Sequence, residues 1–170
     1  MTKPDELTTT TAEQTASATA DRELVITRTF DAPRELVFRA WTDPQQIAQW
    51  WGPVGFTNTV HEMDVRPGGV FRVSMHGPDG TDYPNKIVYE EVVRPERLVY
   101  THDGDIENDP GRFHVTVNFV SLGKKTEVTM RGVFVSKEVF DTLVKEFGVL
   151  EGGEQTFDRL GKFLESIGEN

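Results

Sequence analysis

Hydrophobic and polar residues alternate through the middle of the chain and change to a helical spacing near its end. Residues 70–76, 113–120 and 126–135 place apolar side chains at every second position, which is the pattern of strands with one buried face. From Ser136, the expected N-cap, apolar positions recur every three or four residues up to about residue 167. This spacing predicts one long helix with a continuous apolar stripe.

The first part of the chain shows strand and helix signals in turn. Residues 23–30 are rich in β-branched side chains and predict a strand. Pro33 and the pair Asp43-Pro44 are typical of helix N-termini, so two short helices are expected before Gly52.

The order of these elements predicts an α+β fold. One strand, two short helices, six further strands and a long helix suggest a curved antiparallel sheet of six to seven strands wrapped around the C-terminal helix. A length of 170 residues suits one domain, expected over residues 22–170. Residues 1–21 are polar and of low complexity, and they predict a disordered tail.

Composition narrows the possible partners and the compartment. The chain has 18 basic and 28 acidic residues and a net charge of −10, which disfavours binding to nucleic acids and to anionic membranes. It has no cysteine, which fits a reducing compartment, and it has no apolar run of the roughly 20 residues that a membrane span needs. We therefore expect a cytoplasmic protein.

Motifs for metals, cofactors and covalent catalysis are missing from the sequence. The alternating acidic residues from Asp103 to Asp109 lack the glycine and the glutamate of a calcium loop, and the four histidines have no metal-ligand spacing. No phosphate-binding glycine loop or nucleophile elbow is present, so we expect no metal and no cofactor. Glu91 and His102 could act in acid–base chemistry if they face inward, and the sequence leaves their orientation open.

Four segments of the chain carry a family resemblance: residues 30–53, 64–69, 94–100 and 156–164. In this order they resemble homologues of the activator of the heat-shock-protein-90 ATPase, a family of the START-like (SRPBCC) superfamily, over residues 23–167. The resemblance implies a helix-grip fold with a cavity between the sheet and the long helix. It supplies no catalytic residue that can be carried over to this chain.

Large apolar side chains predicted to face inward are the candidate walls of that cavity. Methionine walls adapt to varied apolar shapes, and the alternative is a filled core without a void. Adjacent helical residues point about 100° apart, so Trp50 and Trp51 are not both expected in one pocket. The candidate residues are Trp50, Trp51, Phe56, Met63, Phe71, Met75, Tyr89, Tyr100, Val117, Met130, Phe134, Gly153 and Phe157.

Gly153 interrupts the predicted apolar stripe between Leu150 and Phe157. Glycine costs about 1 kcal/mol relative to alanine inside a helix, so its presence needs a reason. The favoured interpretation is that the missing side-chain volume is part of a ligand space, and the alternative is that the sheet approaches closely and needs the room. Replacement by leucine stabilises the protein in the first case and destabilises it in the second.

Three functions remain open from the sequence. The favoured one is the binding of a small hydrophobic or amphipathic molecule in the cavity, without catalysis. The alternatives are a cyclase- or isomerase-type enzyme that uses the same cavity, and a co-chaperone-like domain with a weak protein partner. A monomer and a homodimer are both compatible with the sequence.

Overall fold

The computed structural model of this chain describes residues 18–168. The elements, in chain order, are η1 (Ala20–Arg22), β1 (Glu23–Phe30), α2 (Arg34–Thr42), α3 (Pro44–Trp50), β2 (Thr57–Met63), β3 (Val70–His76), β4 (Asp82–Val93), β5 (Arg97–Asp103), β6 (Phe113–Leu122), β7 (Lys125–Phe134), α4 (Lys137–Phe147) and α5 (Val149–Gly168). None of the helices within residues 18–168 is long and apolar enough to cross a membrane.

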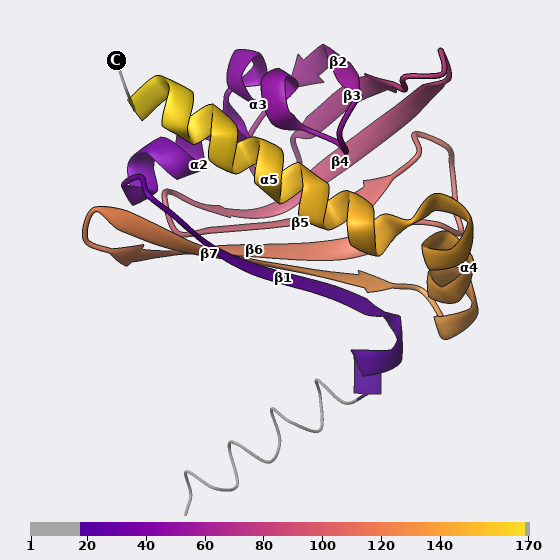
Figure 1. Cartoon of the computed structure of the whole chain (residues 1–170). Helices are drawn as coiled ribbons and strands as arrows, with labels where there is room; N and C mark the ends of the chain where they lie inside the picture. Colours follow the sequence, from indigo (N-terminus) through magenta and orange to yellow (C-terminus); the bar gives the residue numbers. More distant parts are fainter. Residues whose placement is uncertain (1–17, 169–170) are drawn as a thin grey trace, which may run out of the picture.

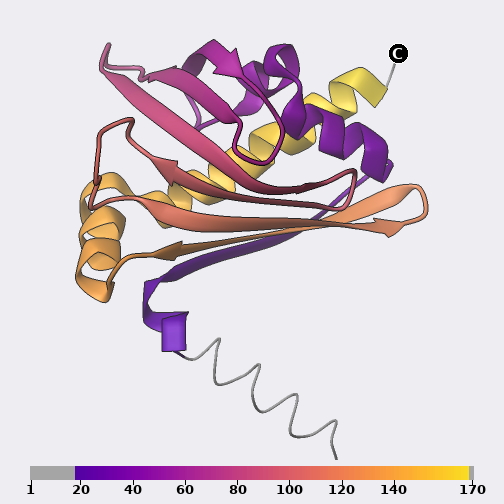
Figure 2. The same ribbon diagram turned by 180° about the vertical axis from the view of Figure 1, so that it is seen from behind.

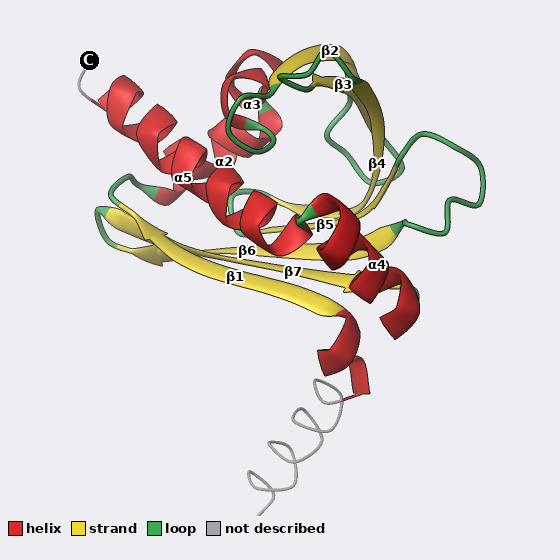
Figure 3. Cartoon of the chain, turned by 45° about the vertical axis from the view of Figure 1, so that its right-hand side comes forward, coloured by secondary structure: helices red, strands yellow, loops and turns green. Residues whose placement is uncertain are grey.

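The strands form one seven-stranded sheet in the order β1-β7-β6-β5-β4-β3-β2. Every neighbouring pair is antiparallel. The sheet curls so that α5 lies across its concave face, as Figures 1 and 3 show. Seen from behind, the strands lie in front and α5 passes behind them (Figure 2). The predicted α+β architecture is confirmed.

The β6–β7 hairpin shows how alternation builds the inner face of the sheet. Val117 pairs with Met130 and Phe119 pairs with Val128, and all four side chains are buried or partly buried. The outer face of the same hairpin carries the polar pair Asn118 and Thr129. One face is therefore apolar and one is solvated, as the sequence predicted.

The turn between β2 and β3 closes against the neighbouring strand β4. The N–H of Gly68 donates to the carbonyl of Tyr89 at 2.7 Å, and the N–H of Tyr89 donates to the carbonyl of Gly69 at 3.0 Å. Segment 64–69 therefore continues the hydrogen bonding of the sheet. Gly69 is buried in this turn and Gly68 is exposed.

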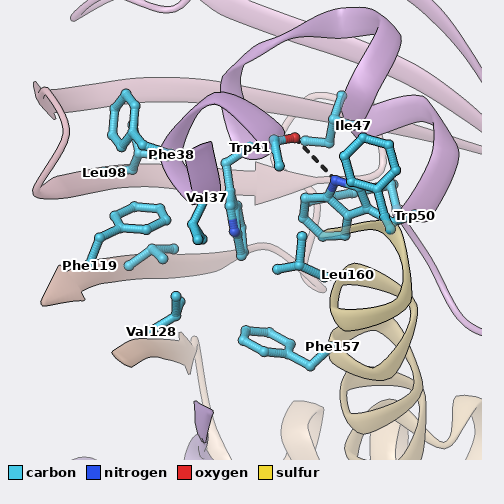
Figure 4. Close-up of a cluster of buried hydrophobic side chains, with 14 of the residues drawn as sticks. Val37, Phe38, Trp41, Ile47, Trp50, Leu98, Phe119, Val128, Phe157 and Leu160 are labelled. Atoms are coloured by element: carbon cyan, nitrogen blue, oxygen red, sulfur yellow. Dashed lines mark hydrogen bonds between the residues drawn. The ribbon is translucent and has the colours of Figure 1, made fainter. Parts of the chain in front are cut away.

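Trp41 of α2 lies at the centre of the core. Figure 4 shows it between the strands and α5, near Phe119 and Phe157. Its ring centroid is 5.0 Å from that of Trp50 and 5.9 Å from that of Phe119, in edge-on contacts that aromatic pairs favour. Trp50 is fully buried, and its indole N–H donates to the carbonyl of Ala40 at 3.1 Å (Figure 4).

The single long helix predicted from Ser136 is wrong in one respect: it is two helices. Ser136 is the N-cap of α4, where its hydroxyl accepts from the N–H of Val139. Gly148 then adopts the left-handed conformation, with φ 59°, and ends α4. Phe147 and Leu150 are 63% and 43% exposed, so the apolar stripe is not continuous. A left-handed glycine terminates a helix while the apolar spacing can resume beyond it, so periodicity alone does not reveal the break.

Residues 1–17 of the predicted disordered tail lie outside the described part of the chain. The last four residues of that segment, 18–21, belong to a short helical turn. The hydroxyl of Thr19 donates to Glu23, and Arg131 donates to the Thr19 hydroxyl at 2.7 Å. The structured part of the chain therefore begins before residue 22.

Candidate functional site

A cavity of about 830 Å³ lies between the first half of α5, α4, the ends of β4, β5 and β6, and the loop after α3. This volume lies within the range of small-molecule sites in proteins. Within residues 18–168, no group of three or more histidine, cysteine, aspartate or glutamate side chains is arranged to hold a metal ion.

Eight of the thirteen predicted cavity residues line this space. They come from the loop after α3, from three strands and from α5, so the fold brings together positions far apart in the sequence. They are Trp51, Phe56, Met75, Tyr100, Met130, Phe134, Gly153 and Phe157.

The other five predicted residues lie elsewhere in the protein. Trp50 and Val117 are fully buried in the core. Phe71 and Tyr89 border a separate small void of about 10 Å³, deeper in the core. Met63 is partly buried and packs against the core cluster. These residues do face inward, but α2 and α3 cover that part of the sheet and fill the space above it.

Gly153 borders the cavity, but its missing side chain does not create it. A Cβ atom on Gly153 would lie 2.8 Å from Cδ1 of Ile26 and 3.4 Å from Cδ2 of Leu24. Both side chains belong to β1, so glycine here permits the close approach of α5 to the sheet. The close approach of the sheet therefore agrees with the structure, and the favoured interpretation, in which the missing side-chain volume forms ligand space, does not.

Alanine substitutions at the two neighbouring glycines are expected to differ in their effect on stability. A Cβ on Gly152 would meet only Cγ of Pro53, at an ordinary contact distance of 3.4 Å. Gly152→Ala should therefore raise the free energy of unfolding by up to about 1 kcal/mol through better helix propensity. Gly153→Ala should not show this stabilisation, because the side chain of Ile26 must shift to make room for the added Cβ atom. Urea unfolding of both variants measures the difference, and equal stabilisation would contradict the close approach.

Arg159 of α5 holds the loop that forms one wall of the cavity. Its Nη1 donates to the carbonyls of Trp51, Gly52 and Pro53 at 3.1, 2.9 and 3.0 Å. Its Nη2 donates to the carbonyl of Gln49 at 3.2 Å. Burial lowers the pKa of Arg159. The guanidinium thus satisfies carbonyls at and beyond the C-terminus of α3, where a positive charge is favoured.

The orientation of the two candidate acid–base residues is decided by the structure. Glu91 is exposed and its carboxylate lies 3.3 Å from Nε of Arg97, away from the cavity. His102 lines the cavity, and its ring lies 5.8 Å from the Trp51 ring and 4.7 Å from the Phe113 ring. Of the two candidate acid–base residues, His102 therefore lines the cavity and Glu91 does not.

The protonation of His102 follows from its surroundings. Burial lowers the pKa of His102 to about 4, and the charge of Asp109 opposes this only partly. The imidazole is therefore neutral near pH 7. Tyr100, two residues earlier on β5, is buried, and burial raises the pKa of its hydroxyl far above neutrality. Both groups are therefore uncharged near pH 7.

A stability loss in acid is expected from His102. In the unfolded chain its pKa returns to about 6.5. Between that value and about 4 the unfolded chain binds a proton that the folded chain does not, so stability falls as the pH drops through this window. Between about pH 7.5 and about pH 5 the loss should be about 2 kcal/mol.

The measurement is urea unfolding at both pH values for the wild type, for His102→Phe and for His114→Phe. His114 is exposed and does not line the cavity, so its variant should keep the acid sensitivity. His102→Phe should lose it. An unchanged acid sensitivity in His102→Phe would refute the assignment.

Comparisons with known proteins agree with this architecture. Residues 31–165 match the family model described as Activator of Hsp90 ATPase homolog 1-like protein. A search of curated proteins found no match.

Several solved structures share the fold. A protein from Arthrobacter aurescens is 26% identical, with a TM-score of 0.81 over 87% of this chain and 88% of that one. Protein Ms6760 from Mycobacterium smegmatis is 26% identical, with a TM-score of 0.77 over 86% of this chain and 92% of that one. CalU16 from Micromonospora echinospora is 23% identical, with a TM-score of 0.59 over 84% and 75%, and it supports the fold alone. The names of these three proteins state no activity.

The family model covers most of the chain, and the matched region includes every strand after β1 together with most of α5. The resemblance seen in the four sequence segments and the helix-grip fold that it implied are both confirmed. The chain belongs to the family of Activator of Hsp90 ATPase homolog 1-like proteins.

Proposed function

We propose that this domain binds a small, largely apolar molecule in the cavity between α5 and the sheet. The observation that carries the proposal is the cavity of about 830 Å³, whose walls are mainly aromatic and aliphatic with few polar groups. Sites for small molecules have this composition, because the apolar body supplies affinity and a few polar atoms supply orientation.

Binding of the neutral dye Nile red, followed by its fluorescence, tests the proposal. Trp41 and Trp51 line the cavity, so their fluorescence should be quenched in parallel. Met130→Trp places bulk into the cavity and should weaken binding. Met63→Trp is the matched control, since Met63 is also partly buried but does not line the cavity. Saturable binding that Met130→Trp weakens and Met63→Trp does not would support the proposal, and absence of dye binding would contradict it.

An isomerase- or cyclase-type reaction is the second candidate, and His102 is the observation that favours it. The ring lies in the cavity, where it could take a proton from a bound molecule. Its pKa of about 4 makes it a weak base near pH 7, because proton transfer is most effective when the pKa lies near the working pH. This property suits a hydrogen-bond acceptor better than a catalyst, so binding is the preferred function.

A further inference from the structure

We propose that the cavity selects uncharged ligands that donate a hydrogen bond to Nδ1 of His102, such as hydroxylated apolar molecules, and that it discriminates against carboxylates. This inference rests on the proposed binding function and adds the chemical class of the ligand to it. It depends on two independent observations, the tautomer of His102 and the charges around the cavity.

The tautomer of His102 is set by its neighbour Asn85. The side-chain amide nitrogen of Asn85 donates to the carbonyl of Tyr83 at 3.1 Å, which leaves its oxygen facing Nε2 of His102. A carbonyl oxygen accepts and does not donate, so Nε2 of the neutral ring must carry the hydrogen. Nδ1 is then an unprotonated acceptor.

Nδ1 of His102 is therefore available to accept a hydrogen bond from a ligand. Among residues 18–168 it makes no hydrogen bond, while the ring itself lines the cavity and contacts Trp51 and Phe113. An apolar ligand that covers this atom without bonding to it leaves an unsatisfied acceptor, which costs free energy. A ligand with a hydroxyl group satisfies this atom, and its apolar body fits the aromatic rings beside it.

Charges around the cavity act against anions. The charged residues that line it are Asp103, Asp109, Glu146 and Glu151, and no lysine or arginine of the described chain lines it. The carboxylate of Asp103 lies 3.9 Å from Nζ of Lys86. The carboxylate of Asp109 accepts hydrogen bonds from the backbone N–H groups of Gly104 and Gly111.

A carboxylate that entered the cavity would lose its hydration without gaining a cation, which is unfavourable. The net charge of −10 adds repulsion at longer range. The same cavity therefore rejects fatty-acid-like anions while it accepts an alcohol or a phenol of similar size.

Three probes with the same apolar body test the proposal by isothermal titration calorimetry near neutral pH. They are 4-hexylphenol, its methyl ether 4-hexylanisole, and 4-hexylbenzoate. The phenol should bind about tenfold more tightly than the ether, because a hydrogen bond to Nδ1 of His102 contributes about 1.4 kcal/mol. The benzoate should bind more weakly than the phenol.

Two sets of variants assign the selectivity. His102→Phe keeps an aromatic ring between Trp51 and Phe113 and should abolish the preference for phenol over ether, whereas His114→Phe should keep it. The double variant Glu146→Gln, Glu151→Gln removes charge at exposed positions of the rim and should improve benzoate binding relative to phenol.

The results of these experiments distinguish a failure of this inference from a failure of the proposed binding function. If wild-type protein binds phenol and ether equally, or binds benzoate as tightly as phenol, the inference is overturned and the binding function stands. If neither Nile red nor any of the three probes binds, the binding function itself fails. Should His102→Phe not fold, a change in the ¹⁵N shift of His102 Nδ1 on addition of phenol but not of ether supports the inference, and an unchanged shift overturns it.

Discussion

Gly69→Ala is expected to lower the free energy of unfolding by about 3 kcal/mol or more, the largest effect of any single methyl addition considered for this protein. A Cβ atom on Gly69 would lie 1.9 Å from the carbonyl oxygen of Asp64, which is closer than any real contact. The clash is with backbone and not with a flexible side chain. The turn cannot shift freely, because Gly68 and Gly69 are both hydrogen-bonded to Tyr89 of β4.

Gly68→Ala is the matched control for this prediction. Gly68 has a positive φ of 83°, but nothing lies within 4 Å of a Cβ placed on it. Its replacement should cost only about 1–2 kcal/mol, the penalty of a left-handed backbone for alanine. Urea unfolding followed by circular dichroism measures both variants. Equal losses at the two positions would show that the contact with Asp64 relaxes easily.

Arg159→Met is expected to lower the free energy of unfolding by about 2–4 kcal/mol, because hydrogen bonds from a charged donor contribute about 1.5–3 kcal/mol each and are not additive. Methionine preserves the apolar stem of the side chain and removes the guanidinium. The carbonyls of Gln49, Trp51, Gly52 and Pro53 then lose a shared donor. Since Trp51, Gly52 and Pro53 line the cavity, binding of Nile red should weaken as well.

Two further substitutions on α5 calibrate the Arg159 result. Arg159→Lys retains the charge but not the planar set of donors, so it should be intermediate. Lys162→Met removes an exposed cation from the same helix and should change stability by less than about 0.5 kcal/mol. A loss in Arg159→Met no larger than that in Lys162→Met would show that solvent replaces the guanidinium without cost.

The boundaries of many elements follow from local sequence. Pro44 at the first position of α3 and the carboxylate of Asp43, which accepts from the N–H groups of Gln45 and Gln46, start that helix as predicted. Ser136 starts α4 in the same manner. Caps and proline positions act through neighbouring residues, so they can be recognised without knowledge of the fold.

The sequence pattern alone does not distinguish Gly148, which ends α4, from Gly152 and Gly153, which lie inside α5. Gly152 and Gly153 are helical, whereas Gly148 is left-handed with φ 59°. All three lie in the same region of apolar periodicity. Which of them ends a helix depends on how α4 and α5 pack, because glycine accepts both conformations at similar cost.

Tertiary structure likewise decided which inward residues border the cavity. Alternation places Phe71 and Met75 on one face of β3, yet Phe71 is covered in the core while Met75 lines the cavity. The difference is the position of α2 and α3 over the sheet. Periodicity reports which face of a strand is apolar, but it carries no information about which distant element covers that face.

The orientation of Glu91 illustrates the same limit within the sheet. The register of β4 against β5 shifts between Tyr89 and Glu91, so Tyr89 is buried while Glu91, two positions later, is exposed. A bulge of this kind reverses the alternation of side chains. The amino-acid sequence by itself determined the strands, the helix starts, the apolar faces and the family. Pairing between distant strands and the packing of α5 decided which polar groups face the cavity, because these depend on contacts between residues far apart in the chain.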